Sequence, residues 1–220
     1  MAYQLRPGVS FCTVAGRCIF LDVPNDRYFA LATDVESSFL KLLSGEPLGA
    51  ADYLALKRIA ATGPLEWCDD VQPILQGPEA PAAVGSLIDP IVERAGTTET
   101  VLALWHLTSA VRRLRRAGLA GALRAFSARK QAARGGLSQE QAGAVAAAFS
   151  AASAYSTALD QCLPRSLAAA SRLASLGGSP ALIIGVKLQP FQAHCWAQCD
   201  GRLINERCEV ARMFTPILVL

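Results

Sequence analysis

The hydrophobic positions at the start of the chain follow a strand-like pattern. Residues 9–14, 17–23 and 27–32 are rich in β-branched and aromatic side chains. An Ala-Gly pair separates the first two segments, and a Pro-Asn-Asp run separates the last two. The pattern therefore predicts a small β-meander of three strands.

After residue 32 the spacing of apolar residues becomes helical. Thr33 or Asp34 is suited to cap a helix that Gly45 ends, and a second helix is expected over 50–61. Three strands followed by helices predict a compact first domain over residues 1–75, near the lower size limit for independent folding. Residues 76–96 are predicted to be a linker, because proline and glycine interrupt this part of the chain.

The rest of the chain, 97–220, predicts a second domain that begins with helices and ends with strands. A long helix starts at Thr97 and is expected to end at Gly118. Later helices are expected over 138–155 and 162–176, and strands over 181–188, 194–200, 202–205 and 212–220. The predicted fold class is α+β.

Composition narrows the picture without naming a function. Hydrophobic residues make up 52% of the 220 positions and charged residues 18%, which excludes global disorder. The net charge of +3 is too small to indicate nucleic-acid binding. The sequence has no apolar run of 18 residues and no P-loop, so we expect neither a membrane span nor a nucleotide site.

Cysteine usage points to a reducing compartment. The seven cysteines are scattered and form no CxxC pair. The first residues of the sequence lack the apolar core of a signal peptide. Free thiols in the cytoplasm are therefore the expectation.

The candidate chemistry lies in the last 60 residues. Cys162 opens a predicted helix, where the helix dipole and free N–H groups favour a thiolate. His194 opens a predicted strand. Asp200, Asn205 and Glu206 lie on the strand or turn that follows and are the candidates for the group that orients the imidazole. A cysteine, a histidine and an orienting polar group together favour nucleophilic catalysis.

Two other interpretations compete with catalysis. The first is purely structural, because a cysteine is often a small buried side chain and a histidine often has no catalytic role. A structural role is also the default interpretation of His106. A zinc site built from His194, Cys195, Cys199 and Cys208 is the second alternative. Strand alternation counts against zinc, because it places His194 on one face and the next two cysteines on the other.

The sequence of this part resembles the lasso-peptide leader peptidases, the B proteins of lasso-peptide biosynthesis, which have a transglutaminase-like fold. The matching segments are DQCLPRSL (160–167), ALIIGV (181–186), FQAHCW (191–196), and the pairs at 200–201 and 205–206. The resemblance implies that Cys162 is the nucleophile, His194 the base and Glu206 the third catalytic residue. Members more often carry Asp at this third position, and Asp200 is the competing candidate.

The front of the chain resembles the precursor-peptide recognition element, a small winged-helix-like module that some B proteins carry fused to the peptidase. The resemblance lies in FLDV (20–23) and RYFAL (27–31), followed by a helix. It implies that the leader peptide adds as a strand along Arg27, Tyr28, Phe29, Ala30 and Leu31, facing the helix over 50–61. A DNA-binding winged helix is the alternative, but that helix offers only two basic residues against one acidic residue.

The resemblance also implies a function and its partners. The chain would bind the leader of a ribosomally made lasso-peptide precursor and cut it from the core without a cofactor or metal. An ATP-dependent cyclase related to asparagine synthetase would then close the macrolactam. The alternatives are a catalytically silent precursor-binding chaperone and an acyltransferase that uses the same cysteine and histidine.

Overall fold

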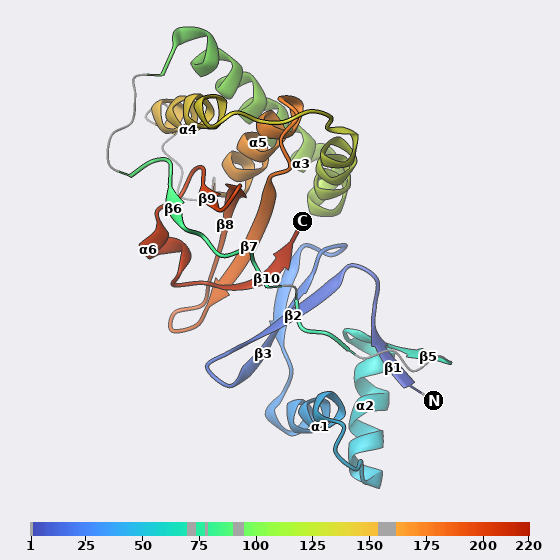
Figure 1. Cartoon of the computed structure of the whole chain (residues 1–220). Helices are drawn as coiled ribbons and strands as arrows, with labels where there is room; N and C mark the ends of the chain where they lie inside the picture. Colours follow the sequence, from blue (N-terminus) through green and yellow to red (C-terminus); the bar gives the residue numbers. More distant parts are fainter. Residues whose placement is uncertain (1, 70–73, 78, 90–94, 154–161) are drawn as a thin grey trace. The chain divides into compact units, whose positions relative to one another are not determined.

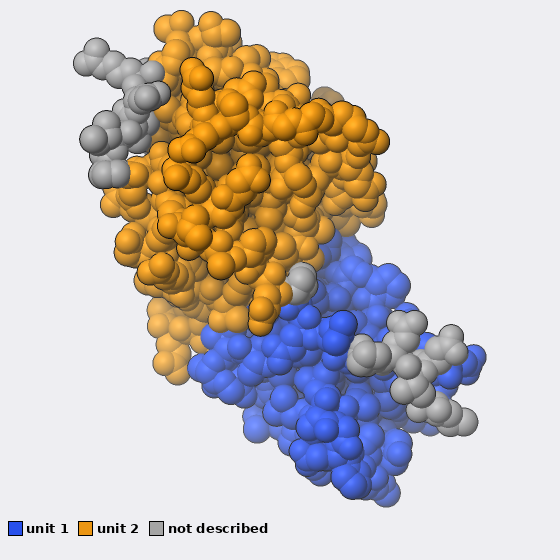
Figure 2. Space-filling model, in the orientation of Figure 1, with its two compact units in different colours: residues 1–78 blue, residues 79–220 orange. Residues whose placement is uncertain are grey.

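The chain forms two compact units, residues 1–78 and 79–220, in a computed structural model (Figures 1 and 2). The structure describes residues 2–69, 74–77, 79–89, 95–153 and 162–220. Both units combine helices with β-sheet, so the fold class is α+β, as predicted. Within the described ranges, no helix has the length and apolarity needed to cross a membrane.

The first unit is built on a three-stranded antiparallel meander. Strands β2 (Val9–Val14), β3 (Arg17–Asp22) and β4 (Arg27–Ala30) lie in the order β2-β3-β4, which confirms the three predicted strands. Their connections turn sharply, with Ala15, Gly16 and Asp26 at positive φ. Strand β4 is consequently an edge strand of this sheet.

Two helices and a second small sheet complete the first unit. Helices α1 (Thr33–Ser44) and α2 (Ala50–Thr62) follow the meander, as predicted. Strands β1 (Ala2–Leu5) and β5 (Leu65–Cys68) pair antiparallel and were not predicted. Each is only four residues long, and its partner is about sixty residues away, so local periodicity does not indicate either strand.

Aromatic side chains form the core of the first unit. Phe11, Phe20 and Phe39 are fully buried, with ring centroids 5.3–5.5 Å apart. Leu56 of α2 and Leu65 of β5 are also fully buried in this cluster. The meander is thereby fixed against both helices, which leaves β4 at the edge of a firmly packed sheet.

The second unit contains a five-stranded sheet in the order β10-β7-β8-β9-β6. Strand β7 (Ala181–Lys187) pairs antiparallel with β8 (Gln192–Cys199) and with β10 (Thr215–Val219). The short β9 (Arg202–Leu203) pairs with β8 and, in parallel, with β6 (Gly85–Ser86). Because β9 pairs only with Gln198 and Cys199, the rest of β8 has no strand on that side among the described residues.

Two predicted segments differ in the structure. The predicted linker 76–96 contains β6, which the sheet recruits by pairing it with a strand more than a hundred residues away. The predicted strand 212–220 is shorter, because the helix α6 (Cys208–Ala211) and a turn precede β10. Both differences arise from contacts that are distant in sequence.

The helices of the second unit gather beside its sheet (Figure 1). They are α3 (Thr97–Ala132), α4 (Gln139–Ser153) and α5 (Cys162–Ser175), and α5 packs against β8. The first helical segment of α3 ends at Gly118, as predicted. Gly118 adopts φ 64°, ψ −177° and bends the chain sharply, and helical structure resumes beyond it. The predicted continuation of α4 to residue 155 lies outside the described residues.

Candidate active site

Cys162 is the first residue of α5, as the sequence predicts. Pro164 is compatible with the first turn of the helix, because the N–H that it lacks has no helical acceptor there. The backbone N–H groups of Leu163 and Cys195 donate to the Cys162 sulfur. The thiol therefore lies where free backbone donors stabilise negative charge.

His194 lies between Cys162 and Glu206. Its Nε2 is 2.5 Å from Oε2 of Glu206, and its imidazole also hydrogen-bonds to the Cys162 thiol. Its side chain is 20% exposed and that of Glu206 is 15% exposed, so the pair is largely shielded from water. The structure thus brings together the three residues proposed for catalysis, although their catalytic roles stay predictions.

Asp200, the competing third residue, lies elsewhere. It occupies the turn after β8 at φ 48°, and its carboxylate accepts a hydrogen bond from the Cys199 thiol at 3.6 Å. Six residues of extended strand separate it from His194, which corresponds to roughly 20 Å. Geometry therefore favours Glu206 as the residue that orients the imidazole.

The side chain of Asn205, the remaining candidate, holds the elements of the site together through hydrogen bonds. Its side-chain amide donates to the Ser166 hydroxyl at 2.8 Å, and its carbonyl oxygen accepts from the Ala197 N–H at 2.8 Å. Ser166 in turn donates to the Cys195 carbonyl at 2.7 Å. Both side chains are buried, and their bonds join the helix of Cys162, the strand of His194 and the loop of Glu206.

Sequence reasoning did not identify Ser166. The available signal was its position four residues after Cys162, which places both residues on the same face of the helix. The other polar side chains of this turn, Cys162 and Arg165, are half-buried, whereas Ser166 is fully buried.

Aromatic rings enclose the imidazole. The ring centroid of His194 is 5.1 Å from that of Phe214 and 6.2 Å from that of Trp196. Gly185 lies directly opposite His194 in the sheet register. A Cβ at Gly185 would come within 2.9 Å of both aromatic side chains, so only glycine leaves them room.

The pKa of Cys162 is lowered despite its environment. Burial raises the pKa of the thiol, but the hydrogen bond and positive charge of His194 outweigh burial. The N–H groups of Cys195 and Leu163 act in the same direction. The thiolate, which is the nucleophilic form, is therefore stabilised.

The two partners of the thiol respond in the matching sense. Burial disfavours the imidazolium, but the bonds to Cys162 and Glu206 and their negative charges raise the pKa of His194 to about 9. Burial also opposes ionisation of Glu206, yet the bond from His194 and the Arg207 N–H lower the pKa of its carboxyl. The arrangement favours a thiolate–imidazolium pair at neutral pH.

The ion pair has a measurable consequence for thiol reactivity. We expect Cys162 to react with iodoacetamide at neutral pH, because the imidazolium preserves the thiolate below the usual thiol range. In His194→Ala the pH dependence should move up by about one unit or more, since the opposite charge is gone. Peptide mapping by mass spectrometry, which separates Cys162 from the other six cysteines, measures the rates. Identical pH profiles would contradict the ion pair.

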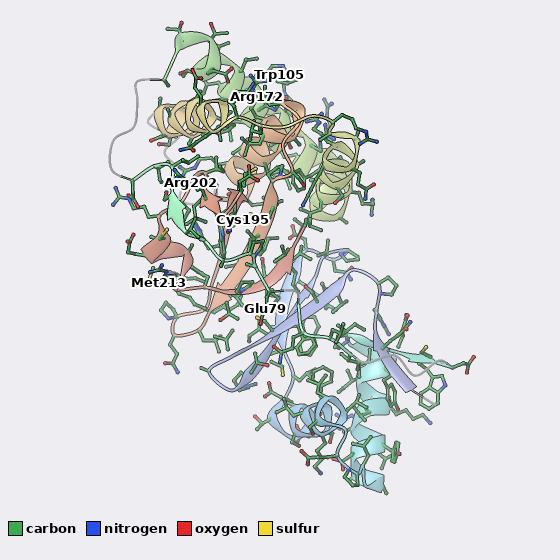
Figure 3. All side chains as sticks on the ribbon, viewed as in Figure 1. Glu79, Trp105, Arg172, Cys195, Arg202 and Met213 are labelled. Atoms are coloured by element: carbon green, nitrogen blue, oxygen red, sulfur yellow. The ribbon has the colours of Figure 1, made fainter. Side chains whose placement is uncertain are left out.

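The neighbouring cysteines have the opposite character. Burial raises the pKa of the Cys195 thiol, and the pKa of Cys199 is raised to about 11, also mainly by burial. Both are buried in β8, which Figure 3 marks by the label at Cys195. Among the described residues, no group of three or more His, Cys, Asp or Glu is placed to hold a metal ion.

Four of the five predicted peptide-binding residues form β4 of the first unit, and Leu31 follows the strand directly. Arg27, Phe29 and Leu31 line a cavity of about 310 Å³ that Arg58 and Ile59 of α2 also line. The Arg27 guanidinium pairs with Asp22 at 3.2 Å and lies 5.3 Å from the ring centre of Phe29. Ala30 is exposed and Tyr28 is half-buried on the same strand. The edge strand and the helix predicted to face it thus border one groove.

Comparison with known proteins gives one match. Residues 104–219 match the family model of the transglutaminase-like superfamily. The match covers more than half of the 220-residue chain and includes Cys162, His194 and Glu206. The chain matched no curated protein and no solved structure. The first unit, residues 1–78, lies outside the matched region.

Proposed function

The chain belongs to the transglutaminase-like superfamily, which includes cysteine proteases and acyltransferases, and from this membership we propose a more specific activity. The protein is a cysteine peptidase that removes the leader from the precursor of a ribosomally made lasso peptide. The observation that carries the proposal is the hydrogen-bonded series of Cys162, His194 and Glu206. The sequence resemblance to lasso-peptide leader peptidases supplies the substrate class.

The reaction follows from the ion pair. The Cys162 thiolate attacks the carbonyl carbon of the scissile peptide bond and forms a tetrahedral intermediate. His194, as imidazolium, protonates the departing amine of the core peptide, and a thioester between Cys162 and the leader remains. Neutral His194 then takes a proton from water, which attacks the thioester and releases the leader acid and the thiolate. Glu206 holds the imidazole in place and stabilises its charged form.

Backbone donors are available for the developing oxyanion. The start of α5 presents N–H groups that no helical carbonyl satisfies. The Leu163 and Cys195 N–H groups donate to the thiolate. During the attack the negative charge moves from the sulfur to the carbonyl oxygen of the substrate, and these donors lie beside the reacting sulfur. Fixed dipoles of this kind stabilise the transition state without reorganising.

The first unit supplies recognition of the leader. Strand β4 is an edge strand among the residues that the structure describes, so an added strand can pair along it. The groove between β4 and α2 offers apolar contacts from Phe29, Leu31 and Ile59 for the side chains of that strand. We propose that this unit is the winged-helix-like module that recognises the leader peptide. Tethering then raises the local concentration of the cleavage site at Cys162.

A proline in the edge strand tests this recognition. Ala30→Pro removes a backbone N–H and is expected to weaken leader binding by roughly tenfold or more. Thr13→Pro, on the opposite edge strand β2, is the matched control and should change affinity by less than about twofold. Leader affinity is measured by fluorescence anisotropy, and circular dichroism checks the fold. Equal affinities for wild type and Ala30→Pro would exclude strand addition at β4.

The proposed activity is tested directly with the precursor. Purified protein and precursor are incubated, and mass spectrometry follows release of the leader. An added amine distinguishes hydrolysis from transfer, because both proceed through the same thioester. A leader acid as the product supports the peptidase, whereas a leader amide would assign acyltransferase activity. The asparagine-synthetase-like cyclase is the proposed partner that closes the released core.

A further inference from the structure

Unit 2 has a cavity among its helices that the proposed reaction does not use. Its volume is about 160 Å³. Trp105, labelled in Figure 3, lines it together with several polar side chains. These are His106, Ser109 and Arg113 from the first half of α3, Arg129 from its second half, and Ser171 from α5.

The bend at Gly118 creates this cavity. In a straight helix, Arg113 and Arg129 would be about 24 Å apart along the axis. The positive φ of Gly118, which glycine adopts without steric cost, turns the second half of α3 back so that both arginines line the same cavity. The fold therefore brings two like charges together.

These charges have no acidic partner in the part of the chain that the structure describes. No ion pair there involves Arg113 or Arg129. The nearby carboxylate of Glu99 is already paired with Arg172 at 2.7 Å. The sequence from 100 to 138 holds eight Lys and Arg and no Asp or Glu, whereas the whole chain carries only +3. Among the described residues, the positive charge at the cavity is thus uncompensated.

His106 is the buried polar group of the cavity. Its relative exposure is 7%, and within the described ranges no group hydrogen-bonds to its ring, which lies edge-on to Trp105. Burial first, and then the charges of Arg172 and Arg129, lower the pKa of His106 to about 4, so the ring is neutral at pH 7. The neutral ring lines the cavity, so a ligand bound there can reach it.

We propose that this cavity binds a small oxyanion, a phosphate or a carboxylate. Two guanidinium groups recognise such an anion through paired, charge-assisted hydrogen bonds, and the hydroxyls of Ser109 and Ser171 add neutral donors. The volume is close to that of a cavity that accepts benzene, about 150 Å³, so it suits a small anion or an anionic end group. The site also gives a role to the basic segment of α3.

Anion titrations of the full chain test the site. Phosphate and acetate are titrated separately at low ionic strength into wild type, Arg113→Gln/Arg129→Gln and Arg112→Gln/Arg116→Gln, and calorimetry measures affinity. The last pair removes the same charge from positions of α3 that do not line the cavity. We expect at least about tenfold weaker binding for the first pair and less than about twofold change for the second. Equal losses in both pairs would overturn the site in favour of diffuse surface charge.

A second readout does not depend on substitution. The chain has two histidines, so ring signals of His106 and His194 are separable by nuclear magnetic resonance. Anion binding should shift the His106 signals and leave those of His194 in place, and no shift at His106 would overturn the proposal. Tighter binding of phosphate would indicate a phosphorylated ligand, and tighter binding of acetate a carboxylate. None of Cys162, His194 and Glu206 lines the cavity, so failure here leaves the proposed peptidase untouched.

Discussion

Replacing Cys162 by alanine is expected to abolish leader release while the precursor still binds. The substitution removes the atom that forms the thioester, so no alternative covalent route remains in the site. We expect the cleavage rate to fall roughly 10⁴-fold or more, as for nucleophile loss in comparable triads. Mass spectrometry of the precursor measures cleavage, and fluorescence anisotropy of a labelled leader measures binding.

Cys199→Ala is the matched control for this variant. Cys199 is buried in β8, the pKa of its thiol is raised, and this thiol donates to the Asp200 carboxylate. The control should therefore cleave at a rate within about threefold of wild type, apart from a modest loss of stability from the small cavity. Cleavage by Cys162→Ala at a comparable rate would remove Cys162 from the mechanism.

The second large effect is expected at Glu206. Glu206→Ala removes the carboxylate that holds the imidazole and stabilises its charge, so the cleavage rate should fall roughly 10²-fold or more. Asp200→Ala, in the turn at the far end of β8, should change the rate by less than about threefold. Steady-state cleavage of the precursor by both variants measures the difference. The reverse order would transfer the third role to Asp200.

The pH profile separates orientation from simple loss of folding. Glu206 contributes to raising the pKa of His194 to about 9, so imidazolium is retained up to that pH in wild type. Without the carboxylate the His194 pKa falls, and the alkaline limb of the cleavage profile should move to lower pH. Glu206→Asp should restore part of the activity, because it preserves the charge. An unmoved alkaline limb would show that Glu206 does not act through the imidazole.

Much of the fold was readable from local patterns. The strands β2, β3 and β4 were predicted because turn-forming residues separate short apolar segments. The start of α5 at Cys162 was predicted because a proline in the first turn and a later glycine pair bound the helix. Pairings between distant segments, such as β1 with β5 and β6 with β9, carry no local signature and were missed.

The candidate site divides along the same line. The sequence alone singled out Cys162 and His194, because its pattern predicts that each opens a regular element. Cys162 does begin α5, whereas β8 begins two residues before His194, at Gln192. The residue pattern left Asp200, Asn205 and Glu206 open, since all three follow the same strand within a few residues, and the family resemblance implied Glu206 with Asp200 as its competitor. The tertiary structure separated them by the turn after β8, which directs Asp200 away and brings Glu206 to the imidazole.

The sequence by itself determined the α+β class, the order of most elements and, from the residue pattern, two of the three candidate catalytic residues, because backbone propensity and capping act over a few neighbouring positions. Only the tertiary structure showed which acidic side chain contacts the imidazole, the hydrogen bond between Ser166 and Asn205, and the approach of Arg113 to Arg129. These depend on a bend at one glycine and on strand pairings across more than a hundred residues, and side chains that meet in this way leave no periodic trace in the chain.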